Sequence, residues 1–449
     1  MIGASKLLNE LTRLVKQSKA DATTVCAHAS TQRVSRFAYD TIHQDLVQET
    51  LTVYVKVIAN KRVGVAITDR LDRTGLSRCL RSALEIARHA PQIKELPPLP
   101  GGHRVMTTED VVDKTAHAPP HHFLTTLKRL FHLCQGVGAQ LAGSFAIGHQ
   151  EAAVANSNRV ACYAASTVAG AKLVTMYGRL SGFAGAVDRD VTQVNLERLL
   201  EQSLKQSLHK REPVALPTGA YEVILEPEAV AELVTWLGYI AFGAKSFHER
   251  TSCLAGRIGE QLMARAITIY DDGNDPSGLR TPFDDEGVPT QQTPLIDRGK
   301  AAGIVYDTAY GQLYAHPSTG HASTPDDVEG PIPSNLFMEP GAKPREELVR
   351  SCKRGLLIPR FHYVSGLLNP REALMTGLTR EGAFLIEDGK RVAPITTMRF
   401  TQGLLDAFGR VLGISKERAL IADPIQEAGC AVMPSLHLAK FKFTGRSDA

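Results

Sequence analysis

The segment Leu51-Thr-Val-Tyr-Val-Lys-Val-Ile58 carries the clearest structural signal in the chain. Its odd positions are aliphatic and its even positions are mostly polar or aromatic, which is the period of two that a half-buried β-strand requires. Residues 59–62 have the composition of a turn, and residues 63–68 are apolar enough to return as a second strand. The segment therefore predicts a β-hairpin.

Helices and a second hairpin are predicted around this one. Apolar residues recur at spacings of three and four in residues 7–15 and 75–89, which indicates amphipathic helices packed on a core. Further helices are expected at about 122–139 and 195–210, with strands at 145–149 and in a hairpin over 169–187. Residues 62–66 and 180–184 share a Gly, an apolar residue and an Ala in the same order, which is a weak sign of internal duplication.

The Pro-containing stretch at residues 211–219 is the best candidate for a domain boundary. Beyond it, we expect a strand at 221–225, a helix from Pro227 to about Gly243, and then mainly strands, at 267–270, 303–306, 382–387 and 435–443. Strands that follow strands favour an α+β fold over a doubly wound one. We expect an N-terminal α/β domain with hairpins and helices at 1–212 and a β-rich C-terminal domain at 213–449.

Composition excludes several classes of protein. The 449 residues are 43% hydrophobic and 22% charged, which is typical of globular chains. Lys and Arg number 51 against 47 Asp and Glu, and the two signs are interleaved, so we expect no direct nucleic-acid binding. Mean hydropathy is −0.11 and no apolar run approaches the ~20 residues of a membrane span. We expect no membrane association.

Cysteine usage indicates a reducing compartment. The seven cysteines are scattered and none forms a C-x-x-C pair, which disfavours a disulfide framework or a zinc knuckle. The first ten residues lack the apolar core and cleavage site of a secretory leader. A cytoplasmic location is therefore expected.

Common catalytic motifs are absent, since the chain has no G-x-S-x-G elbow and no Walker A loop. Asp284-Asp285-Glu286 forms an acidic cluster that either binds a cation or organises a turn through backbone hydrogen bonds, and the turn is favoured. The loop His316-Pro-Ser-Thr-Gly-His321 has two imidazoles among small residues and is a candidate wall of a substrate cleft. Cys430 is interpreted as a buried thiol rather than a nucleophile.

Motifs in both halves resemble the TldD/PmbA family, known as modulators of DNA gyrase. In the N-terminal half these are Arg62-Val-Gly64 and Ala87-Arg-His-Ala-Pro91. In the C-terminal half they occur in family order: Gly256-Arg-Ile-Gly-Glu260, Thr268-Ile-Tyr-Asp-Asp272, Pro282-Phe-Asp-Asp-Glu-Gly-Val-Pro-Thr290, Ser318-Thr-Gly320, Pro333-Ser-Asn-Leu336, Cys352-Lys-Arg-Gly-Leu356, Gly377, Gly382-Ala-Phe384, Glu387-Asp-Gly-Lys390 and Pro394-Ile395.

The resemblance implies where a zinc site would lie. Catalytic TldD-type subunits carry H-E-x-x-x-H on the helix after the strand that resembles Tyr221–Leu225, and the two imidazoles hold zinc. In this chain Thr235, Trp236 and Ile240 occupy those positions, and no His lies between Tyr221 and Phe247. The nearby His248, with Cys253 after it, lacks the family's order. We therefore assign no metal ligand and no catalytic residue to this chain.

The resemblance then implies a TldE (PmbA)-like subunit that pairs with a zinc-holding TldD-like subunit, in a complex that degrades unfolded or small peptides. Candidate cleft residues are His316, Ser318, Thr319, Gly320, His321 and Asn335. Three alternatives stay open: a homodimer, a self-sufficient hydrolase that uses Cys430 or His248 with Cys253, and a non-enzymatic binding protein of the gyrase-modulator type.

Overall fold

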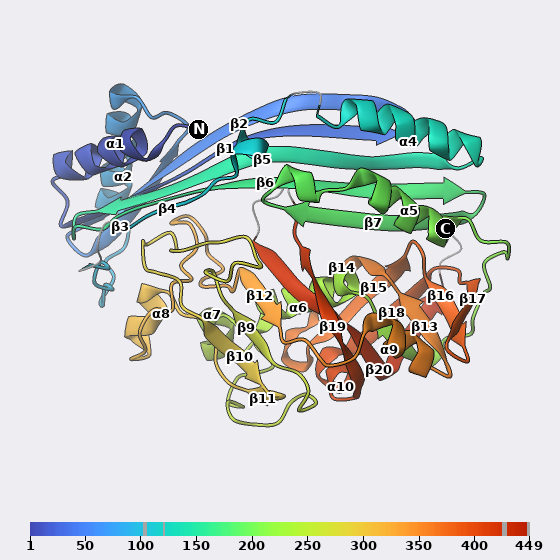
Figure 1. Cartoon of the computed structure of the whole chain (residues 1–449). Helices are drawn as coiled ribbons and strands as arrows, with labels where there is room; N and C mark the ends of the chain where they lie inside the picture. The colour runs from blue at the N-terminus through green and yellow to red at the C-terminus, as the bar shows by residue number, and fades with distance from the viewer. Residues whose placement is uncertain (102–105, 120–121, 424–428, 447–449) are drawn as a thin grey trace.

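Two β-sheets and their flanking helices make up an α+β fold (Figure 1). The computed structural model describes residues 1–101, 106–119, 122–423 and 429–446. The first sheet takes its strands from residues 22–188 and arches over the second, whose strands come from residues 219–446 (Figure 1). Among the described residues, the helices are all too short or too polar to span a bilayer.

The first sheet is built from two copies of one α-β-β-β-α unit. The first copy comprises α1 (Ala4–Gln17), β1 (Ala22–Ala38), β2 (Thr41–Ala59), β3 (Arg62–Thr68) and α2 (Arg73–His89). The second comprises α4 (Leu124–Gly136), β5 (Gln140–Asn156), β6 (Ala161–Tyr177), β7 (Leu180–Asp188) and α5 (Leu196–Ser207). Between them lie β4 (Met106–Asp110) and α3 (Asp113–Ala116). The central strands β1 and β5 pair antiparallel, so the sheet order is β3-β2-β1-β5-β6, with β7 and β4 both paired to β6.

Close packing of a helix on an edge strand explains the sequence similarity between residues 62–66 and 180–184. A Cβ on Gly64 of β3 would lie 2.0 Å from the Ala83 carbonyl oxygen of α2, and a Cβ on Gly182 of β7 would lie 2.0 Å from the Ser203 carbonyl oxygen of α5. Both strands therefore require glycine at this point. The weak sign of duplication in the sequence corresponds to a repeat of the whole unit.

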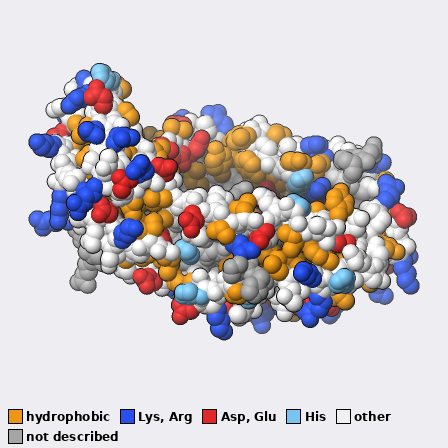
Figure 2. Space-filling view, turned by 90° about the horizontal axis from the view of Figure 1, so that it is seen from above, with side chains coloured by type: hydrophobic (Ala, Val, Ile, Leu, Met, Phe, Trp, Pro, Cys, Tyr) orange, Lys and Arg blue, Asp and Glu red, His pale blue; other side chains and the backbone are white. Residues whose placement is uncertain are grey.

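The helices cover only the ends of the outer face of this sheet. Helices α1 and α2 pack on Val25, Val53 and Val55, while α4 and α5 pack on Phe145 and Leu173 near the opposite end. Figure 2, which views this face, shows hydrophobic side chains in a hollow beside the α1–α2 end. The inner face of the sheet lies over the second half of the chain.

The second sheet has thirteen strands around one buried helix. The main path is β11 (Lys300–Ala301), β10 (Thr293–Asp297), β9 (Ile269–Asp271), β12 (Asn335–Met338), β20 (Cys430–Arg446), β8 (Gly219–Leu225), β13 (Arg354–Ile358), β16 (Phe384–Glu387) and β17 (Lys390–Pro394). Off this path lie β14 (Arg360–Asn369), β15 (Leu374–Arg380), β18 (Met398–Gly403) and β19 (Val411–Ile421). Short helices α7 (Ala244–His248), α8 (Thr308–Leu313), α9 (Arg345–Ser351) and α10 (Leu404–Phe408) occupy the connections.

Helix α6 (Pro227–Ala241) begins with Pro227 in its first turn, as expected, and buries most of its length against β14 and β20. The hairpin of β2 and β3 is confirmed, with Asn60 and Lys61 at its turn. One prediction is wrong. Residues 303–306 form no strand, and only Val305 makes an isolated bridge, to Gly243. The chain there leads into α8, so its apolar residues pack in the core without a neighbouring strand.

Candidate functional site

Helix α6 offers no zinc ligand at the positions that the resemblance to TldD-type subunits implies. Thr235 is exposed, Trp236 is partly exposed and Ile240 is 4% exposed, within the core. An indole N–H donates a hydrogen bond but cannot coordinate a metal, and an aliphatic side chain has no nitrogen, oxygen or sulfur atom to coordinate one. Zinc in proteins takes imidazole, thiolate or carboxylate ligands. The residues present do not fit a zinc ion.

Trp236 is held by its neighbours on one face of α6. Its indole donates a hydrogen bond to Glu232, one turn earlier, and its ring lies edge-on to Tyr239 with centroids 5.9 Å apart. Gly366 of β14 packs against the ring, since a Cβ there would lie 3.0 Å from Trp236 Cε3. Burial raises the pKa of Glu232. On this face of α6, the Trp236 ring is therefore held in place by its neighbours and is partly exposed to solvent.

Asp284 organises the loop that begins near Pro282. Its Oδ1 accepts hydrogen bonds from the backbone N–H groups of Glu286 (3.0 Å) and Val288 (2.8 Å), and its Oδ2 accepts one from Ala322 (2.9 Å). Burial and the adjacent Glu286 raise the pKa of Asp284 well above its usual value. These bonds are the arrangement that the turn interpretation of the acidic cluster predicts.

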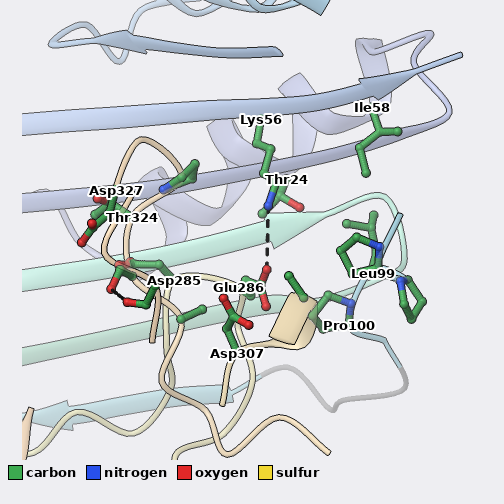
Figure 3. Close-up of a pocket in the computed structure, with 17 residues that line it drawn as sticks. Thr24, Lys56, Ile58, Leu99, Pro100, Asp285, Glu286, Asp307, Thr324 and Asp327 are labelled. Carbon is green, nitrogen blue, oxygen red and sulfur yellow. Dashed lines mark hydrogen bonds and ion pairs between the residues drawn. The ribbon is translucent and has the colours of Figure 1, made fainter. Parts of the chain in front are cut away.

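The other two carboxylates of the cluster point elsewhere. Asp285 Oδ1 lies 2.6 Å from His28 Nε2 on β1. Glu286 accepts a hydrogen bond from the Thr308 backbone N–H at 3.1 Å and lies 3.8 Å from Lys56 Nζ on β2 (Figure 3). Because each carboxylate has its own partner, the three do not converge on one point. Two of them instead join the second half of the chain to the first sheet.

Two cavities lie in this cleft between the halves. One, of about 110 Å³, is drawn in Figure 3 and lies beside Lys56, Glu286 and Asp307. The other, of about 350 Å³, lies between the inner face of the first sheet and residues 280–285. Thr324 and Asp285 line both. The cleft is therefore a candidate binding site that joins the two sheets.

The six candidate cleft residues occupy two environments. Thr319, His321 and Asn335 are at most 7% exposed and form one buried hydrogen-bond network: His321 Nδ1 lies 2.9 Å from Thr319 Oγ1, its Nε2 lies 2.8 Å from Asp271 Oδ1, and Asp271 Oδ2 accepts from the Asn335 backbone. This network holds the loop that contains Thr319 and His321 in place. The part of this loop that lines the smaller cavity is the segment that follows, residues 322–325.

The remaining candidates flank that network. Gly320 has φ +77°, and a Cβ there would lie 2.4 Å from the Pro289 carbonyl oxygen, so the loop and the Asp284 turn touch at this glycine. Ser318 is partly buried and donates to the Tyr306 carbonyl. His316 is exposed and stacks on Tyr306 with centroids 4.2 Å apart.

The residues considered as an alternative hydrolytic site are not assembled as one. Cys430 Sγ donates to Asn335 Oδ1 and accepts from the Leu279 N–H, and burial raises its pKa to about 12. Burial also raises the pKa of Cys253 to about 12. His248 stacks on Tyr314 and its Nε2 lies 3.0 Å from the Tyr306 hydroxyl. Neither thiol is a ready thiolate nucleophile.

Two groups of metal-ligating atoms come together in the described part of the chain. They are Cys26, His28 and Asp285, and Glu222, Cys352 and His437, with ligand atoms within 4.8 Å of one another in each group. Each group already contains a histidine–carboxylate contact of 2.6 Å. Burial and neighbouring carboxylates raise the pKa of Cys26 well above its usual value, which favours the thiol over the thiolate that a metal needs.

Two β-sheets with a cleft between them, and a buried helix packed in the second half, define an α+β protein. The sequence model described as the PmbA/TldA metallopeptidase C-terminal domain matches residues 218–445. The chain therefore belongs to the TldD/PmbA metallopeptidase family, as its motifs indicated.

Individual relatives agree with this assignment. The chain is 30% identical over 227 residues to the metalloprotease TldD homolog of Haemophilus influenzae, covering 48% of this chain and 44% of that one. It is 24% identical over 251 residues to the metalloprotease PmbA homolog of the same organism, covering 55% and 50%. The matched region thus spans about half the length of these relatives.

Solved structures share the whole fold. TldE from Thermococcus kodakarensis matches with a TM-score of 0.86 at 22% identity, covering 98% of this chain and 100% of that one. A Thermotoga maritima protein named for modulation of a DNA gyrase matches with a TM-score of 0.83 at 18% identity, covering 98% and 100%. At these identities the likeness establishes the fold.

Sequence reasoning missed two charged or titratable residues that strands β1 and β2 contribute to the cleft, namely His28 and Lys56. His28 and Lys56 alternate with apolar residues on long strands and look like ordinary exposed positions. Only the strand register identifies the inner face, on which Cys26 and His28 project together.

Proposed function

We propose that this chain is a non-catalytic, TldE-like subunit of a TldD/TldE-type zinc metalloprotease complex that degrades or processes unfolded or small peptides. In this proposal a TldD-like partner holds the zinc, and this chain encloses the partner's active site. The single observation that carries the proposal is that three residues of α6, Thr235, Trp236 and Ile240, cannot ligate zinc. The likeness to TldE across the whole fold supports it.

The cleft supports a role in peptide binding rather than bond cleavage. The hydrogen bonds of Asp284 and Asp285 position its loops, and burial raises the pKa of the Cys26 and Cys430 thiols. A subunit of this kind acts on hydrolysis by shaping the space around the partner's zinc and by excluding folded chains. We place the complex in the cytoplasm, with a heterodimer as its smallest unit.

Mixing tests the proposal directly. The isolated chain should cleave no unfolded peptide, whereas a mixture with a cognate H-E-x-x-x-H subunit should form a complex and exceed the peptidase activity of either component. Mutation of the partner's Glu should abolish that activity. His248→Ala and Cys430→Ala in this chain serve as controls and should leave most of it.

Two outcomes would contradict the proposal. If the two chains do not associate at micromolar concentration, or associate without gain of activity, the hetero-complex is wrong. If the isolated chain cleaves peptides and loses that activity in the Cys430 or His248 variant, the self-sufficient hydrolase is the better account.

A further inference from the structure

Arg280 lines the larger cavity of the cleft and has a buried guanidinium N–H that finds no acceptor in the described part of the chain. This cavity, which we name the Arg280 pocket, has a volume of about 350 Å³, is walled by the inner face of the first sheet, and is closed on the other side by residues 280–285. The Arg280 side chain is partly buried, and its Nε is buried with no hydrogen-bond acceptor among the described residues. A buried N–H of a charged group that lacks an acceptor is costly, so it points to a group that is absent here.

The acidic residues that line the same pocket are engaged with other groups. Asp285 contacts His28 at 2.6 Å, and Asp110 forms an ion pair with Arg189. The Glu151 carboxylate points to the outer face of the sheet, where it accepts hydrogen bonds from the backbone N–H groups of Ile2 and Gly3 and from the Tyr163 hydroxyl. Among the described residues, the Arg280 guanidinium therefore has no ion-pair partner in this lining.

The rest of the lining is uncharged. Ala152 and Ala164 form an apolar patch on the inner face of β5 and β6, and Thr52, Thr108, Gln150 and Ser166 add uncharged hydrogen-bonding groups. A cavity of this size lies at the lower end of the ~300–1,000 Å³ range of small-molecule sites. Its volume admits two or three small residues of a peptide, and its polar groups match the needs of a peptide backbone.

We propose that the Arg280 pocket binds the α-carboxylate of a short peptide, with the peptide backbone lying along the inner face of β5 and β6. This proposal rests on the proposed function and specifies how that function selects its substrate: peptides enter by a free C-terminus. A guanidinium fork binds a carboxylate through two parallel, charge-assisted hydrogen bonds.

The surroundings favour a carboxylate over a phosphate. A phosphate group carries nearly two negative charges at neutral pH and is usually held by several cations. The lining of the Arg280 pocket supplies one guanidinium without an ion-pair partner among the described residues, while His28 contacts Asp285, and the carboxylates of Asp110 and Asp285 stand near. One negative charge balances the pocket, and a second is repelled by those carboxylates.

Calorimetric titration of the isolated full-length chain tests the assignment. Trialanine should bind with a measurable heat, whereas trialanine amide, which has the same shape without the terminal charge, should bind at least about tenfold more weakly. Arg280→Gln should weaken trialanine binding at least about tenfold and should erase the difference between acid and amide. Arg298→Gln, which changes an arginine whose side chain is 80% exposed, is the matched control and should change neither.

A stability measurement separates this role from a structural one. If Arg280 awaits a ligand, Arg280→Gln should leave the melting temperature of the free protein unchanged or raise it, because it removes an unpaired, partly buried charge. A large drop in melting temperature, equal binding of acid and amide, or tighter binding of inorganic phosphate than of trialanine would each overturn the proposal. Since no partner is present in this experiment, a failure to assemble an active complex would count against the proposed function and not against the Arg280 pocket.

Discussion

His28 Nε2 on β1 lies 2.6 Å from Asp285 Oδ1, a contact that links residues 257 positions apart and joins the first sheet to the loop that carries the acidic cluster. A second, longer link joins Lys56 on the neighbouring strand, β2, to Glu286, the residue after Asp285. Its Lys56 Nζ lies 3.8 Å from Glu286 Oε1. The cleft between the two halves is therefore held by side-chain pairs as well as by apolar packing.

A double-mutant cycle measures the first link. His28→Ala and Asp285→Ala should each lower the free energy of unfolding, and the double variant should lose less than the sum. We expect a coupling of about 1–2 kcal/mol, which is the usual size for a partly buried, charge-assisted hydrogen bond. Lys56 with Glu286 is the control pair and should couple more weakly, because its atoms are farther apart. Additive losses for His28 and Asp285 would show that the contact contributes nothing to stability.

The Asp284 turn should be sensitive to the shape of its acceptors. Asp284→Ala leaves one buried and two partly buried N–H groups without acceptors and should destabilise the protein by about 3 kcal/mol. Asp284→Asn keeps one oxygen for the N–H groups of Glu286 and Val288 but turns an amide N–H₂ towards Ala322, so about 1–2 kcal/mol should be lost. Chemical unfolding of both variants checks this order. Calcium-dependent melting of the wild type would revive the cation-site interpretation.

Glu228, in the first turn of α6, should make stability depend on pH. Burial, helped by the nearby Glu226, raises its pKa from 4.5 to about 7. The folded protein therefore holds this proton more tightly than the unfolded chain does. The stability that is intact below about pH 4.5 is lost as the pH rises through 7, by up to about 3 kcal/mol at ~1.4 kcal/mol per pH unit.

Substitution separates Glu228 from the other titrating groups. Glu228→Gln should flatten the decline of the unfolding free energy between pH 5 and 8 and should stabilise the protein at pH 8. Glu201→Gln, an exposed glutamate paired with Lys205 at the surface, is the control and should leave the decline in place. An unchanged pH profile in the Glu228 variant would contradict the raised pKa.

Trp236 is the only tryptophan and reports on the face of α6 that the proposed partner covers. The ring is partly exposed beside Thr235, which is exposed. Binding of a TldD-like subunit over this face should remove water from the indole and shift its emission to shorter wavelength. Experiments with a tryptophan-free variant of the partner keep the signal specific, and Trp236→Phe should abolish it. A complex that forms without any change in emission would place the partner on another surface.

The seven cysteines should react poorly with thiol reagents in the native protein. All are free and buried, and burial raises the pKa of each of them, to about 12 for Cys430 and Cys352. Thiolate is therefore scarce at pH 8, and a disulfide reagent should titrate less than one thiol per native chain but seven after denaturation. Rapid native labelling at Cys430 would reopen the nucleophile interpretation.

Local sequence was sufficient to predict a strand where helices cover one face of that strand along the whole segment. The hairpin was predicted from residues 51–68 because α2 packs over that part of β2 and buries Val53, Val55 and Val57. The preceding ten residues, 41–50, belong to the same strand but are mostly exposed, because neither helix pair reaches the middle of the outer face. They carry no alternation, so the first half of β2 could not be predicted from its residues.

By itself the sequence determined that Thr235, Trp236 and Ile240 offer no imidazole, thiolate or carboxylate ligand, since side-chain identity decides this in any fold that keeps the helix. Only the tertiary structure decided what the cleft contains. The contact between His28 and Asp285, the burial of His321 against Asp271, and the isolation of Arg280 all depend on segments far apart in the chain. The physical reason is that hydrogen bonding and desolvation are set by the atoms surrounding a side chain, and here those atoms come from residues distant in the sequence.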